Sequence, residues 1–163
     1  MQVVWRRRVP YPRQRVLSQY FDLEHARYVH PRSLGESRLV SCAGNSVWFE
    51  QQWPRRFCLR FSSVFRLDLL APNRARFRVV RGLFRGSQVS VILHEQDGQT
   101  LIEETYDIAS PLPSWSWLER MVRSWLLKKV DAVWKEDLDV GLPHGGWPGV
   151  PRTVDAELVG ARD

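Results

Sequence analysis

The run from Phe57 to Leu69 constrains the fold of this chain more than any other segment. One face of the run takes Phe57 and every second residue after it, and the other face carries Arg60, Arg66 and Asp68. A period of two is typical of a β-strand that turns one face to a core and the other to water. Such a strand needs neighbouring strands and a second layer that covers its apolar face.

Six more segments show strand patterns and supply those neighbours: 3–9, 36–41, 47–53, 74–80, 87–94 and 101–108. Asp97-Gly98 is the clearest turn signal among them, because this dipeptide favours a two-residue hairpin between antiparallel strands. Between the first two segments, residues 13–21 and 23–29 read as two short helices or one bent helix. The second should end at His30, because Pro31 disfavours the helical conformation in the residue before it.

A long helix is expected after Pro111-Leu112-Pro113-Ser114 and should end near Val140-Gly141. Its helical stripe comprises Trp115, Leu118, Val122, Trp125, Leu126, Lys129, Val133 and Asp137, with Met121, Val130 and Trp134 beside it. At 163 residues the chain has the length of one domain, which we assign to residues 1–140. Residues 141–163 are rich in Gly and Pro, lack periodicity and are predicted to form a flexible tail.

The charge of the chain indicates a solvated protein surface more than a nucleic-acid partner. Its formal net charge is +6 and its pI is about 9.9, but the arginines are spread along the polar sides of the strands. We therefore expect no nucleic-acid binding, and a docking surface for an acidic electron-transfer protein is the functional alternative. No apolar run is long enough to span a bilayer. Two cysteines, and charge placed after the first apolar residues, favour a cytoplasmic protein.

The segment Asp22-Leu23-Glu24-His25-Ala26-Arg27-Tyr28-Val29-His30-Pro31 holds two of the four histidines and an acid. Imidazole is a common metal ligand, and two imidazoles with one carboxylate form the facial triad of non-haem Fe(II) oxygenases. A spacing of five would separate His25 and His30 on a regular helix. Pro31 lets His30 leave the helical track, so that the two rings converge.

A third ligand must come from elsewhere in the chain, and Asp137 is the candidate. It continues the apolar stripe of the long helix, whereas Glu119 and Asp131 point away from that stripe. An unpaired buried carboxylate is costly, so an inward Asp137 is either a ligand or part of a frayed helix end.

The string Asp-x2-His-x4-His-Pro, followed by Ser33-Leu34-Gly35, resembles the iron-binding segment of the Rieske non-haem iron oxygenases, in particular the vanillate-demethylase type. The resemblance implies Fe(II) on His25 and His30, with Asp22 as the acid that orients a histidine. It also implies a carboxylate from the C-terminal helix, where Lys135-Glu136-Asp137-Leu138 matches. The family usually has an Asn shortly before the Asp, and this chain has none there.

The resemblance covers only the catalytic domain, residues 1–139. A Rieske cluster needs two Cys and two His in paired motifs, and neither Cys42 nor Cys58 has a His close behind it. A separate ferredoxin or reductase would therefore supply electrons, and the substrate would be an apolar or aromatic small molecule.

The order of strands and helices resembles the helix-grip fold of START-like (SRPBCC) proteins. This α+β fold wraps a curved antiparallel sheet around a long C-terminal helix and leaves an apolar cavity between them. We expect Phe61, Phe65 and Trp125 to contribute to its wall.

Two other functions fit the same fold. One is a non-enzymatic START-like carrier of a hydrophobic ligand, with the histidines lining its pocket. The other is a metal-independent cyclase or dehydratase that uses His25, His94 or Glu104 as acid or base.

Overall fold

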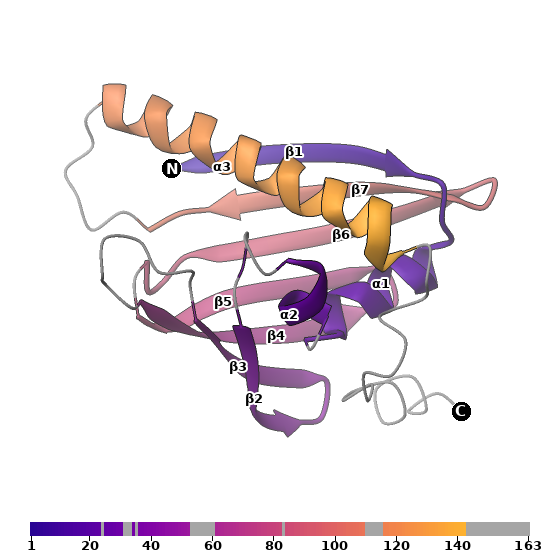
Figure 1. The fold of residues 1–163 in the computed structure, drawn as a ribbon, viewed down its shortest axis with the longest axis horizontal. Coiled ribbons are helices and arrows are strands. Elements are labelled where there is room, and N and C mark those ends of the chain that lie inside the picture. The colour runs from indigo at the N-terminus through magenta and orange to yellow at the C-terminus, as the bar shows by residue number, and fades with distance from the viewer. Residues whose placement is uncertain are drawn as a thin grey trace.

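The computed structural model describes residues 1–23, 25–30, 34, 36–52, 61–82, 84–109 and 116–142. A seven-stranded antiparallel sheet forms one layer, and the long helix α3 (Ser116–Glu136) crosses it on the same side as two short helices (Figure 1). The predicted α+β helix-grip architecture is therefore confirmed.

The elements follow the order expected from the sequence. They are β1 (Gln2–Val9), α1 (Arg13–Phe21), α2 (His25–Val29), β2 (Glu36–Ala43), β3 (Ser46–Gln52), β4 (Ser62–Ala71), β5 (Arg74–Gly82), β6 (Gln88–Gln96), β7 (Gln99–Asp107), α3 and the short π-helix η1 (Asp137–Gly141). The strands lie in the order β1-β7-β6-β5-β4-β3-β2. Strands β2 to β7 thus form an unbroken series of hairpins, and β1 joins the far edge beside β7.

Two predictions from the sequence concern the Asp97-Gly98 turn and the alternation in β4. Asp97 and Gly98 have φ angles of 53° and 72°, which a two-residue hairpin of type I′ requires, and they join β6 to β7. In β4, Ser63 and Leu67 are buried on the inner face, as the period of two predicts. Asp68 was expected to face water with the other polar side chains of the strand, but it is 5% exposed because it pairs with Arg66 and Arg78. The strand begins at Ser62 within the described residues, and the predicted strand residues 57–60 lie outside them.

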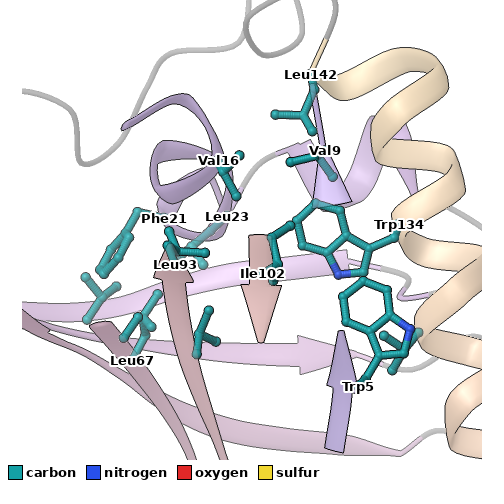
Figure 2. Packing of buried hydrophobic residues seen from close by; sticks show 14 of the residues in the cluster. Trp5, Val9, Val16, Phe21, Leu23, Leu67, Leu93, Ile102, Trp134 and Leu142 are labelled. Atoms are coloured by element: carbon teal, nitrogen blue, oxygen red, sulfur yellow. The ribbon is translucent and has the colours of Figure 1, made fainter. Parts of the chain in front are cut away.

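The core lies between the inner face of the sheet and the C-terminal half of α3 (Figure 2). Leu67, Leu93 and Ile102 are almost completely buried on the strands. Trp134 of α3 stacks on Trp5 of β1, with ring centroids 5.8 Å apart and planes 16° apart. Burial of each large apolar side chain contributes about 1.5–3 kcal/mol relative to an exposed one.

The buried face of α3 differs from the predicted one. Its most buried apolar residues are Val130 and Trp134, whereas Trp125 is 49% exposed. Phe61, also expected to line the cavity, is 43% exposed, and only Phe65 packs against the core. The apolar positions of α3 cover a wide arc, and packing on Trp5 selects a different part of that arc from the one predicted.

The folded part of the chain extends slightly beyond the expected boundary at residue 140. The π-helix η1 ends at Gly141, and the side chain of Leu142 is buried in the core. The flexible tail was predicted for residues 141–163, of which 143–163 lie outside the described residues. Among the described helices, none combines the length and apolar character that a membrane span requires.

Candidate metal centre

The two histidines of the sequence motif stand at the two ends of α2. His25 is the first residue of the helix, and His30 directly follows its last residue, Val29. The Asp22 carboxylate accepts the backbone N–H of His25 at 3.2 Å and so caps the start of the helix. Both histidines are buried, and their ring centroids lie 5.1 Å apart. The structure thus brings the two rings together despite their spacing of five.

Asp137 lies beside both rings. It is the first residue of η1 and is 5% exposed. Its Oδ1 lies 3.0 Å from Nε2 of His30 and 3.6 Å from Nε2 of His25. One potential ligand atom from each of the three residues lies within 4.8 Å of the others, and the described residues contain no second group of this kind. Asp137 is therefore the acid of the C-terminal segment that lies beside both histidine rings.

On the side that faces away from Asp137, Nδ1 of each ring meets a hydrogen-bond acceptor. Nδ1 of His30 lies 2.7 Å from Oε2 of Glu136, and Nδ1 of His25 makes a very short contact with the main-chain carbonyl of Asp22. Metal-ligating histidines generally donate their other ring N–H to such acceptors, which fixes the tautomer and the ring orientation. Gln19 adds an amide N–H, which it donates to Asp137 Oδ1 at 2.9 Å.

The pKa values of the two imidazoles are shifted in opposite directions. Burial lowers the pKa of His25, and the nearby Asp137 offsets this only in part. Burial would also lower the pKa of His30, but its hydrogen bonds to Asp137 and Glu136 outweigh that effect and raise it. Burial thus favours the neutral form of His25, the form that binds metals, and the two carboxylates favour the protonated form of His30, with which a bound cation would compete.

Two contacts differ from the expected site. Asp22 was predicted to orient a histidine with its carboxylate, but its main-chain carbonyl meets the ring and its carboxylate caps α2. Glu136, which was not among the predicted site residues, provides the carboxylate that holds His30. In the sequence, the position of Glu136 beside Asp137 in an acidic pair could have identified it as a site residue. No sequence pattern predicts that Gln19 belongs to the site, because a glutamine in a short polar helix is expected to be exposed to solvent.

The donor set fits a transition metal. Two imidazoles and one carboxylate suit Fe(II) and also Zn²⁺, and three protein ligands leave positions for water or a ligand. An interior site of this kind limits access of water, and Glu136 and Gln19 supply the outer hydrogen bonds that such sites need.

A second buried carboxylate, Glu104 of β7, is 3% exposed. Its Oε1 accepts the Tyr20 hydroxyl at 2.5 Å and the Trp134 indole N–H at 3.3 Å, and its Oε2 accepts the Tyr106 hydroxyl in a very short contact. Burial raises the pKa of Glu104 against the opposing effect of these hydrogen bonds. His94, by contrast, is exposed on the outer face of β6. Of the candidate acids and bases, only His25 and Glu104 are therefore interior.

Comparisons with solved structures agree with the architecture. The protein TTHA0849 from Thermus thermophilus is 17% identical, with a TM-score of 0.71 over 85% of this chain and 95% of that one. A START superfamily protein from Mycobacterium smegmatis is 12% identical, with a TM-score of 0.68 over 85% and 94%. The Zhui aromatase/cyclase from Streptomyces sp. R1128 is 13% identical, with a TM-score of 0.63 over 89% and 93%.

These identities are low enough that the likeness shows the fold alone. No family model and no curated protein matches the sequence. The fold is therefore the helix-grip fold of START-like proteins, and the activity has to be argued from the site.

Proposed function

We propose that this protein binds Fe(II) at His25, His30 and Asp137 and uses it on an apolar or aromatic ligand held between the sheet and α3. One observation carries the proposal. Ligand atoms from α2 and from η1, which are separated by about a hundred residues of chain, lie within 4.8 Å of one another. The resemblance of the histidine segment to Rieske oxygenase catalytic domains supports iron over zinc.

The residues around the site have separate tasks in this proposal. Bound Fe(II) would supply the chemistry of O2 activation, with coordination positions left open for O2 and the ligand. Glu136 and the Asp22 carbonyl orient the rings, and Gln19 fixes the Asp137 carboxylate. With no Rieske cluster in the chain, a separate ferredoxin or reductase would supply electrons.

Metal analysis tests the proposal. Protein prepared anaerobically should bind about one Fe(II) per chain, since three ligands form one site. The double change His25→Ala with His30→Ala should abolish binding and keep the far-UV circular dichroism spectrum. His94→Ala removes an exposed histidine on the outer face and should bind iron like the wild type. Stoichiometric iron in the double variant would falsify the assignment.

A metal-independent cyclase or dehydratase, or a carrier, is the second candidate, and the structure comparisons favour it over an oxygenase. Two of the similar structures are an aromatase/cyclase and the di-domain ARO/CYC BexL, the latter with a TM-score of 0.67 at 11% identity. The interior Glu104 and His25 would act as acid and base.

Removal of metal separates the two candidates. Once a ligand is known from a screen of apolar aromatic compounds, its conversion or binding is measured before and after chelation. If conversion or binding is unchanged after chelation, the protein is a metal-independent cyclase, dehydratase or carrier. If conversion is lost and Fe(II) restores it, the protein is an iron oxygenase.

A further inference from the structure

Three aromatic side chains form a continuous series between the candidate metal centre and the protein surface. Tyr20 meets Trp134 edge-on, with ring centroids 5.8 Å apart, and Trp134 stacks on Trp5 at the same centroid distance (Figure 2 shows the two indoles). The inner end adjoins the site. Burial and Glu104 raise the pKa of the Tyr20 hydroxyl most, and the charge of Asp137 raises it further, which places Tyr20 near the site. Trp134 lies one helical turn before Asp137.

Each aromatic group of the series donates a hydrogen bond to a carboxylate. The Tyr20 hydroxyl and the Trp134 indole N–H both reach Oε1 of Glu104, at 2.5 Å and 3.3 Å. The Trp5 indole N–H reaches Oδ1 of Asp131 at 2.8 Å, and Asp131 is exposed. A phenol or an indole becomes strongly acidic when it loses an electron. A carboxylate that takes the proton therefore makes the oxidation easier.

Ordinary core packing does not account for Glu104. A buried carboxylate is costly, and among the described residues its hydrogen bonds come from three neutral donors and from no cation. An apolar side chain at this place would avoid that cost. Burial also raises the pKa of Glu104, which makes it a better proton acceptor than a surface carboxylate.

We propose that Tyr20, Trp134 and Trp5 form an electron-transfer path that draws an oxidising equivalent from the metal centre to the surface at Asp131. The proposal rests on the proposed metal function. The direction follows from chemistry, because phenols and indoles give up an electron only to strong oxidants. A mild donor such as a ferredoxin could not use this path to send electrons inward. The path would instead protect the interior when a peroxide oxidises the bound metal without a ligand present.

One oxidising equivalent moves from the metal to the surface in successive one-electron steps, each coupled to a proton transfer. Tyr20 gives one electron to the oxidised metal, which is reduced by one level, and its hydroxyl proton passes to Glu104. Trp134 then reduces the Tyr20 radical, which recovers a proton from Glu104 as the indole of Trp134 releases its own to the same carboxylate. Trp5 then reduces the Trp134 radical, which recovers its proton from Glu104, and Trp5 releases its own indole proton to Asp131. A thiol reductant in solution would restore Trp5.

A photochemical experiment tests the path without iron. Lys128 is exposed on α3, one turn before Asp131, so Lys128→Cys can carry a ruthenium photo-oxidant, with Cys42 and Cys58 replaced by serine. Without a reductant, transient absorption after a flash should show a tryptophan radical followed by a tyrosyl radical, because the path is reversible and the oxidising equivalent collects on the phenol, the easier group to oxidise. With a thiol reductant the tyrosyl radical should decay faster, because reduction of Trp5 draws the equivalent outward. Tyr20→Phe should remove the tyrosyl signal.

The remaining variants decide the route. Trp134→Phe keeps an aromatic ring but removes the redox-active indole, and it should abolish the tyrosyl signal, as should Trp5→Phe. Tyr106→Phe removes the other phenol on Glu104 and should keep the signal. The path is overturned if Trp134→Phe and Trp5→Phe leave the tyrosyl yield unchanged, or if Tyr106→Phe abolishes it. Iron titration of the same protein tests the metal function separately, so failure of one does not imply failure of the other.

Discussion

The carboxylate of Glu136 lies 2.7 Å from Nδ1 of His30, on the side of the ring that faces away from Asp137. This contact turns Nε2 toward the candidate metal centre. Glu136 thus links the last residue of α3 to the segment after α2, and it joins two parts of the chain that have no local relationship in the sequence.

Glu136→Gln should weaken Fe(II) binding by about 10–100-fold, because loss of an outer carboxylate typically reduces metal affinity by that factor. Competitive titration with a chelator of known affinity measures the change. Glu103→Gln is the matched control, since Glu103 pairs with exposed Arg6 on the outer face of the sheet. Equal affinities in the two variants would count against a role for Glu136 in orienting His30.

Asp137→Asn and Asp22→Asn should separate the two acids near the histidines. Asp137→Asn should abolish Fe(II) binding, because the anionic ligand is lost. Asp22→Asn keeps a side-chain oxygen that can cap α2, so both iron content and stability should stay near wild type. Asp22→Ala should cost about 0.5–2 kcal/mol of stability in urea unfolding. Iron retained by Asp137→Asn would remove Asp137 from the ligand set.

Leu67→Ala should lower the free energy of unfolding by about 2–5 kcal/mol, the usual effect of removing a large side chain from a packed core. Leu67 is fully buried on β4, whereas Leu70 of the same strand is 51% exposed. Leu70→Ala should therefore change stability by less than about 0.5 kcal/mol. Chemical denaturation of both variants measures the difference, and similar losses would mean that β4 does not face the core as described.

Asp68 should make the stability of the fold depend on pH in the acid range. Burial alone would raise the pKa of its carboxyl, but hydrogen bonds from Ser46, Arg78 and Arg66 outweigh burial and lower it. A carboxyl with a lowered pKa stabilises the folded state above its unfolded pKa of about 3.9, and this contribution disappears as pH falls through the folded value.

Asp68→Asn should therefore cost about 1–3 kcal/mol near neutral pH, the usual effect of losing a charged hydrogen-bond partner, and less in acid. Urea unfolding at a series of pH values measures this. Asp107→Asn, at the exposed end of β7, serves as the control. An Asp68→Asn penalty that stays constant down to acid pH would contradict the predicted role of the charge.

The local features of this protein are those that its sequence determined. The period of two in β4, the Asp97-Gly98 hairpin and the end of α2 just before His30 each depend on neighbouring residues, so each could be predicted from pattern alone. His25 and His30 could be paired as candidate ligands for the same reason, because they are only five residues apart in the sequence.

Only the tertiary structure decided which distant groups meet. Asp137 lies beside a histidine 107 positions away because the Trp134–Trp5 contact orients α3 on the sheet. That orientation leaves Trp125 exposed, although its place in the apolar stripe predicted the opposite. Periodicity shows that a helix has an apolar arc, but packing against the other elements selects the part of the arc that is buried. Packing also explains why Glu136, and not Asp22, supplies the carboxylate that orients a histidine. Only packing brings Glu136 to the His30 ring, whereas the Asp22 carboxylate caps α2.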